Sequence, residues 1–340
     1  MDEHFLSVGK LDPKTLRKLV FSHLGALDPR IILGPNIGED ATIIDLEGRA
    51  LVVHSDPITG AIKNVGWLAV NVCANDIATR GVRPQWMLTV LLLPENFNSA
   101  QLKNLTTQID EAAKALGIAV VGGHTEVTPS TNRPIIIATA MGETSKDKFV
   151  KTSGAQLGDS VIITKGAAIE GTAILSHELY SLLECKVNKK ILEKAKQFIK
   201  MTSVVKDALT AVEVGGVHAM HDATEGGIAG GLQELAWASN VGIVAYEEKI
   251  PIHPETEIIC RALGIDPLKT ISSGALVISA QSEKAQKIVA TLRKKGIQAS
   301  VIGRIVSKKE GAYIVRKGGT NLHLEKPVKE ELWKALKKHL

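Results

Sequence analysis

The sequence predicts an α/β protein of two domains, because short apolar strands alternate with amphipathic helices along almost the whole chain. The chain has 340 residues, 44% of them hydrophobic, which is enough to form two cores. A segment rich in Lys, Ser and Gly, residues 142–158, interrupts the alternation. We place the domain boundary there, which gives predicted domains of residues 1–150 and 151–340.

The first half opens with a predicted helix that begins at Asp12-Pro13 and runs to about Gly25, followed by a loop over residues 31–38. Two short runs separated by Glu47-Gly48 predict a hairpin. The hairpin strands cover residues 41–45 and 51–54, and the later elements are helices over 64–79 and 99–116 and strands over 86–93, 118–121 and 134–141.

The second half repeats the alternation, beginning with a strand over residues 160–164. A strand over 217–220 leads directly into an acidic, glycine-rich turn and then a helix over 227–239. The other predicted elements are helices near 170–183, 189–214, 254–263 and 282–295 and strands over 242–246, 275–279 and 299–302. Layers of helix and sheet are therefore expected in both halves.

Acidic residues lie at several breaks between these elements. Asp40 and Asp56 lie at opposite ends of the predicted hairpin, where antiparallel pairing would bring them together, although both could be ordinary turn residues. Asp76 falls on the apolar stripe of its helix, where a carboxylate is costly unless it is paired or binds a metal. The alternative is a buried Asp that caps a neighbouring loop. Converging carboxylates repel one another unless a cation lies between them. We expect this cation to be Mg²⁺, because Mg²⁺ binds both carboxylate and phosphate oxygens.

The turn from Asp222 to Gly227 joins a strand to a helix. Thr224 can cap the helix, and Gly226 and Gly227 leave first-turn amides open to an approaching phosphate. The alternative is a tight turn that needs glycine only for packing. Asp222 and Glu225 beside the turn favour a site.

A second glycine pair, Gly122-Gly123, follows a predicted strand and permits close approach of the backbone. His124 after it could be a ligand, a proton donor or a loop histidine that makes one hydrogen bond. His54, His221 and His253 show no pairing pattern and are assigned no role.

Composition excludes several other classes of protein. The net charge of +5 and the 4% aromatic content argue against a nucleic-acid-binding surface. The three widely spaced cysteines form neither a zinc motif nor a disulfide framework. The N-terminus does not resemble a signal peptide, and the longest apolar runs have strand length, so we expect a cytoplasmic protein without membrane association.

The motifs GEDA, SDP, NDIATRGVRP, GGHTE and HDATEGG, in this order, resemble the PurM-like superfamily. This superfamily comprises aminoimidazole ribonucleotide (AIR) synthase, thiamine-monophosphate kinase, selenophosphate synthetase and the hydrogenase-maturation factor HypE. The resemblance covers about residues 9–303 and is greatest to HypE-like members. It implies a homodimer whose N-terminal sheets form a shared barrel, with ATP and Mg²⁺ bound beside the interface and the γ-phosphoryl group passed to a second substrate.

The resemblance also implies roles for individual residues. Asp40, Asp56, Asp76 and Asp222 match acids that hold Mg²⁺–ATP, with Asp76 and Asp222 also expected to act in catalysis. Glu225, which matches an Asp of the kinase branch, and His124, which stands where the family commonly has an acid, are also expected to act in catalysis. The matching cofactor-binding positions are Ser55, Asn75, Gly122, Gly123, Thr125, Thr224, Gly226 and Gly227.

One departure bears on the reaction. HypE ends in a tail whose cysteine carries the carbamoyl group, whereas this chain ends in Lys-Lys-His-Leu. The sequence therefore predicts an ATP-dependent enzyme of HypE-like type with an unidentified acceptor, either a small molecule or one borne by a maturation partner. A small-molecule kinase resembling thiamine-monophosphate kinase is the alternative that Glu225 favours. A non-catalytic, dimeric ATP-binding maturation or scaffold protein is the second alternative.

Overall fold

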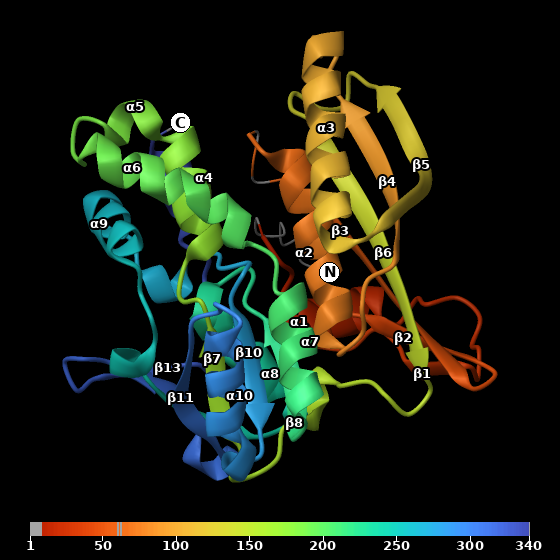
Figure 1. The fold of residues 1–340 in the computed structure, drawn as a ribbon, viewed down its shortest axis with the longest axis vertical. Helices are drawn as coiled ribbons and strands as arrows, with labels where there is room; N and C mark the ends of the chain where they lie inside the picture. Colours follow the sequence, from red (N-terminus) through yellow and green to blue (C-terminus); the bar gives the residue numbers. More distant parts are fainter. Residues whose placement is uncertain (1–8, 60, 62, 340) are drawn as a thin grey trace.

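Two sheets, one from each half of the chain, organise the molecule (Figure 1). The computed structural model describes residues 9–59, 61 and 63–339. The first sheet has the order β1-β2-β3-β6-β4-β5, and only its β4–β5 pair is parallel. Its strands are β1 (Ile31–Leu33), β2 (Thr42–Leu46), β3 (Arg49–Ile58), β4 (Trp86–Leu93), β5 (Ala119–Val127) and β6 (Ile135–Ser145).

Two long helices cover one face of this sheet (Figure 1). Helix α2 (Val65–Thr79) packs on β3 and β6 and is buried along nearly its whole length. Helix α3 (Ser99–Leu116) packs on α2. It begins with a capping box between Asn98 and Gln101 and ends at Gly117, which adopts the left-handed φ of +70° that favours glycine. A Cβ on Gly66 would lie 2.6 Å from the carbonyl oxygen of Leu105, so glycine permits the close approach of the two helices.

The second sheet has the order β13-β12-β9-β11-β7-β10-β8, and only its β9–β12 pair is parallel. Its strands are β7 (Ser160–Thr164), β8 (Val217–Asp222), β9 (Gly242–Tyr246), β10 (Leu276–Ala280), β11 (Ala299–Val306), β12 (Ala312–Val315) and β13 (Asn321–His323). The accompanying helices are α4 (Ile169–Glu178), α5 (Tyr180–Leu183), α6 (Lys189–Lys196), α7 (Val205–Val214), α8 (Gly227–Ser239), α9 (Pro254–Leu263), α10 (Ser282–Lys294) and α11 (Leu332–His339).

The two halves meet where α2 packs against α7 and β8. Asn75 is fully buried at this contact, where its amide nitrogen donates to the carbonyl oxygen of Thr202 (2.9 Å) and its oxygen accepts from the amide of Val204 (2.7 Å). The ends of α2 and β8 are therefore held side by side, and both carry aspartates.

The predicted α/β class is confirmed, and most element positions agree with the sequence. The predicted N-terminal helix is shorter than expected, with α1 (Pro13–Thr15) continuing only into a π-helical turn, Leu16–Val20. The predicted loop over 31–38 begins with β1, and Gly122–Thr125 continue strand β5 instead of forming a loop. The first sheet is open along its described strands, so a closed barrel would need a second copy of the chain.

Candidate active site

Three acids converge at the junction of the two halves. Asp40 lies just before β2, Asp76 lies in the last turn of α2 and Asp222 is the last residue of β8. All three are buried, with 7%, 8% and 1% of their surfaces exposed. Ligand atoms of Asp40, His221 and Asp222 lie within 4.8 Å of one another. The fold thus brings together carboxylates that are up to 182 positions apart in the sequence.

The electrostatics of this cluster match a cation site. Burial raises the pKa of Asp76 well above its ordinary value, and the charges of Asp40 and Asp56 raise it further. Burial likewise raises the pKa of Asp222, and the charges of Asp76 and Asp40 add to the effect. The pKa of Asp56 is raised chiefly by burial. A bound cation would relieve both the desolvation and the mutual repulsion of these groups.

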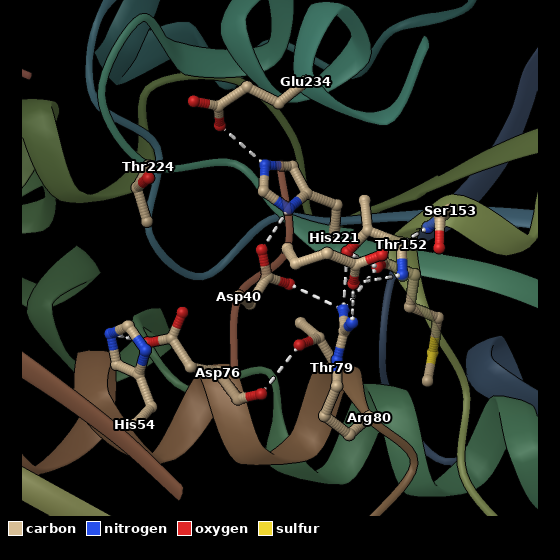
Figure 2. A network of polar contacts seen from close by, with 12 residues as sticks. Asp40, His54, Asp76, Thr79, Arg80, Thr152, Ser153, His221, Thr224 and Glu234 are labelled. Carbon is tan, nitrogen blue, oxygen red and sulfur yellow. Dashed lines mark hydrogen bonds and ion pairs between the residues drawn. The ribbon is translucent and has the colours of Figure 1, made fainter. Parts of the chain in front are cut away.

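Asp40 differs from the other acids because two cationic groups hold it ionised (Figure 2). Burial would raise its pKa, but the charges of His221 and Arg80 outweigh burial and lower it to about 2. Nδ1 of His221 contacts Oδ1 of Asp40, and its Nε2 lies 2.8 Å from Oε2 of Glu234. These two carboxylates raise the pKa of His221 well above its usual range despite burial. The charged His221 side chain therefore pairs with two carboxylates and links Asp40 to Glu234 on α8.

The second cationic group that pairs with Asp40 is the fully buried guanidinium of Arg80, the residue directly after α2 (Figure 2). Its Nη1 donates to Oε2 of Glu39 (2.5 Å) and its Nη2 to Oδ2 of Asp40 (3.0 Å). Nη2 also donates to the hydroxyl of Thr152 (2.6 Å) and to the carbonyl oxygen of Met220 (3.1 Å). Glu39 in turn accepts from the amides of Thr152 and Ser153. The network joins the start of β2, the end of α2, the inter-domain segment and β8.

The residues present fit Mg²⁺. Oδ2 of Asp222 is buried and has no hydrogen-bond partner among the described residues, which is a costly state that a cation would relieve. Carboxylate oxygens are the ligands that Mg²⁺ prefers. His221 is already engaged through both ring nitrogens, so its role is to position Asp40. Among the described residues, Asp40 and Asp222 are the carboxylates whose oxygens lie close enough to each other to share one ion.

A cavity of about 940 Å³ opens beside this cluster, between the two halves. Lys10, Asp56, Thr224 and Glu225 line one part of it. Nζ of Lys10 lies 3.3 Å from both Oγ1 of Thr224 and Oε1 of Glu234. Desolvation would lower the pKa of Lys10, but the charges of nearby acids outweigh it and raise the pKa; these acids are Glu234, Glu225, Asp222 and Asp40. Glu170, Ser273, Glu330 and Trp333 line another part. The cavity therefore combines a cationic group beside the acid cluster with a separate carboxylate-rich wall.

Several residues expected in the site make other contacts. The amide of Gly226 donates to Oε2 of Glu330 (2.6 Å), and the amide of Gly227 donates to the carbonyl oxygen of Thr224 (3.0 Å). A Cβ on Gly227 would lie 2.5 Å from the carbonyl oxygen of Thr270, so packing alone requires glycine there. The side-chain amide of Asn75 is used entirely at the inter-domain contact described above. The hydroxyl of Ser55 lies 3.0 Å from that of Thr139 on β6.

The Gly122–Thr125 segment lies on β5, the exposed edge strand of the first sheet (Figure 1), whereas the acid cluster comes from the residues next to β2, the end of α2 and the end of β8. His124 contacts Glu126 (3.1 Å) and is 63% exposed. A Cβ on Gly123 would lie 1.8 Å from the carbonyl oxygen of Thr89 on β4, so this glycine serves the close pairing of the two strands. Within the described chain, these four residues and the aspartates do not form one site.

Sequence reasoning missed the charged residues that hold the acids. His221 was assigned no role, and Arg80, Glu39 and Glu234 were not considered as site residues. One signal was available: Glu234 is the only charged residue in α8, and Glu170 is one of few in α4. A lone charge in an otherwise apolar helix needs a partner, by the argument applied to Asp76.

The family follows from sequence comparison. Residues 38–144 match the model of the AIR synthase related protein N-terminal domain, and residues 156–316 match that of the C-terminal domain. The chain therefore belongs to the AIR synthase related family, which confirms the resemblance predicted from its sequence motifs.

Among its relatives are hydrogenase-maturation proteins. The chain is 28% identical to a putative hydrogenase expression/formation protein of Methanocaldococcus jannaschii, with 90% of this chain and 91% of the relative covered. It is 28% identical to the carbamoyl dehydratase HypE of Escherichia coli (86% and 88% covered). The crystal structure of E. coli HypE superposes with a TM-score of 0.74 at 26% identity (91% and 95% covered). HypE in complex with ATP gives a TM-score of 0.73 at 24% identity (97% and 98% covered), which shows the shared fold.

Among the described residues there is no helix with the length and hydropathy needed to cross a membrane.

Proposed function

We propose that this protein is an ATP-dependent enzyme of HypE-like type that activates a second substrate by phosphoryl transfer. Asp40, Asp56, Asp76 and Asp222 would hold Mg²⁺ with the nucleotide phosphates. The observation that carries the proposal is the set of buried carboxylates from both halves whose pKa values are raised by burial and by one another. Family membership and the ATP complex of HypE support it.

The residues of the chain divide the work of phosphoryl transfer. When bound, Mg²⁺ would neutralise phosphate charge and polarise the transferred group. Lys10 and Thr224 would bind phosphate oxygens at the mouth of the cluster, where their side chains already lie 3.3 Å apart. His221 and Arg80 would keep Asp40 ionised and correctly placed. Catalysis of this kind depends mainly on positioning and charge neutralisation.

The acceptor and its delivery are part of the proposal. The described residues that line the cavity include no cysteine. Cys73 and Cys260 are buried, and burial raises the pKa of both thiols. The third cysteine, Cys185, is exposed but does not line the cavity. The acceptor is therefore a separate molecule, either small or carried by a cytoplasmic maturation partner. The structure of a HypE–HypF complex, with a TM-score of 0.71 at 25% identity, supports the partner.

We also propose a homodimer formed through the first sheet. Side chains on the face of this sheet opposite α2 and α3 are apolar yet only partly buried, including Leu88 (38% exposed) on β4. At its edge, Val121 and Val127 on β5 are 55% and 59% exposed. Apolar patches of this kind are typical of protein interfaces. In such a dimer the β5 segment with His124 and Thr125 would lie at or near the interface.

A small-molecule kinase is the second candidate. Glu225, which matches an acid of the kinase branch, lines the cavity, and its carboxylate accepts the backbone amide of Lys10 (3.0 Å). The fold is shared with a thiamine-monophosphate kinase, at a TM-score of 0.69 and 22% identity. A non-catalytic ATP-binding scaffold would keep the same acids without turnover.

Release of phosphate from ATP, measured with and without Mg²⁺, tests the enzyme proposal. We expect Mg²⁺-dependent turnover that Asp222→Asn reduces at least about 100-fold. Removing one group that stabilises the charge of the transition state typically costs about 3 kcal/mol, which corresponds to a rate loss of this size. Asp45→Asn changes an acid near the end of β2 that pairs with Lys146 and does not line the cavity. It is the matched control and should keep wild-type turnover. Stimulation by thiamine monophosphate would favour the kinase. Mg²⁺-dependent ATP binding without turnover, even with many candidate acceptors, would support the non-catalytic scaffold instead of an enzyme.

A further inference from the structure

Two polar groups in the wall of the cavity lack partners. Glu170, in the first turn of α4, is 4% exposed, and its Oε2 has no hydrogen bond among the described residues. Ser273, in the loop before β10, is fully buried, and its Oγ likewise has no hydrogen bond there. Both residues line the cavity. A buried polar group without a partner destabilises the protein, and a ligand that supplies N–H donors would recover that loss.

The charges around Glu170 are predominantly negative. Burial raises its pKa to about 7, the nearby hydroxyl of Ser273 partly offsets this effect, and the charges of Glu330, Asp56 and Asp222 act in the same direction as burial. The cavity lining contains four acids and two bases, namely Asp56, Glu170, Glu225 and Glu330 against Lys10 and Arg133. Lys10 already pairs with Glu234. This part of the cavity therefore has an excess of carboxylates over cations.

Glu330 makes this wall rigid. Its carboxylate accepts the backbone amides of Gly226 (2.6 Å), Ile271 (3.1 Å) and Leu332 (2.6 Å), which anchor the segment before α11 across the start of α8. The anchored segment presents Leu332 and Trp333 to the cavity, and Ile174 of α4 adds a third apolar side chain. An apolar surface thus adjoins the unpartnered groups.

We propose that Glu170 and Ser273 form a binding site for an organic cation with at least two N–H donors, such as an amidinium or guanidinium group, attached to an apolar body. The cationic group would donate to Oε2 of Glu170 and to Oγ of Ser273, and the apolar body would lie against Ile174, Leu332 and Trp333. As the site for the second substrate, this inference rests on the proposed function. As a binding site, it is measurable without nucleotide.

Benzamidine and benzamide are a suitable pair of probes, because they have the same shape and differ in charge. Calorimetric titration of the full chain at pH 8 should show benzamidine binding at least tenfold more tightly than benzamide. Glu170→Gln keeps the size of the side chain and removes its charge, so it should weaken benzamidine binding at least tenfold. Glu248→Gln, at an exposed position in the turn after β9, is the matched control and should bind like the wild type.

Equal affinity for the two probes, or unchanged benzamidine binding by Glu170→Gln, would overturn the inference. If Glu170→Gln does not fold, Ser273→Ala should weaken benzamidine binding at least threefold, and wild-type affinity in that variant would overturn the inference equally. Titration of the wild type with Mg²⁺–ATP separates the two proposals. Nucleotide binding without benzamidine binding would refute only the proposal of the cation site. Benzamidine binding without nucleotide binding would refute only the proposed ATP-dependent function.

Discussion

Replacing Arg80 with methionine should destabilise the protein strongly, because the guanidinium neutralises two buried acids. The side chains of Arg80, Glu39 and Asp40 are 0%, 2% and 3% exposed. Breaking a buried ion pair by removing one partner costs about 3–5 kcal/mol, since the other charge stays buried without compensation. With an unfolding entropy of about 2.1 cal/mol/K per residue, or roughly 0.7 kcal/mol/K for the whole chain, Tm should fall by about 4–7 °C.

Thermal and urea unfolding followed by circular dichroism measure this effect. Arg261→Met, which breaks an exposed pair with Glu257 on α9, is the control and should cost less than about 0.5 kcal/mol. The double variant Arg80→Met/Glu39→Gln should recover part of the loss, because one of the two orphaned charges is then removed. A free energy of unfolding for Arg80→Met within about 1 kcal/mol of wild type would refute the reasoning.

Two further predictions concern pH and assembly. Burial raises the pKa of Glu170 from 4.5 to about 7, with Glu330, Asp56 and Asp222 acting in the same direction. The folded protein therefore binds more protons than the unfolded chain between these values, and stability falls as pH rises through this window. The free energy of unfolding of Glu170→Gln minus that of the wild type should therefore be larger at pH 8 than at pH 5, by up to about 3 kcal/mol. Urea unfolding at both pH values measures it, and an equal difference between variant and wild type at the two pH values would contradict the assignment. Val121→Glu should convert a dimer of two 36.4 kDa chains to monomers in sedimentation equilibrium, while Glu126→Gln on the same strand should not; a monomeric wild type would contradict the dimer.

The helices, the strands and the acidic residues of the site could be predicted from the sequence, but the residues that hold those acids in place could not. Hydrophobic periodicity places Asp76 on the buried stripe of α2, and the structure finds it buried there. Periodicity identifies which face of an element is buried, but not which distant element packs against that face. The contact of Arg80 with Met220 spans 140 positions and that of Glu330 with Gly226 spans 104, and both depend on how the two halves dock.

The Gly226-Gly227 turn shows the same limit. An isolated helix start offers free amides, and the sequence gives no sign that a carboxylate from the C-terminal segment accepts one of them. The edge position of β5 was also hidden, because a strand followed by two glycines reads as a strand that ends. Such assignments require the tertiary structure.

The central claim is that the buried aspartates bind Mg²⁺ together with ATP. Calorimetric titration of ATP with and without Mg²⁺, on wild type, Asp76→Asn and the control Asp45→Asn, tests it most directly. We expect Mg²⁺-dependent binding by wild type and the control, and at least a tenfold loss, or about 1.4 kcal/mol, in Asp76→Asn with its fold intact. Binding that is independent of Mg²⁺, or equally tight in Asp76→Asn, would contradict the account.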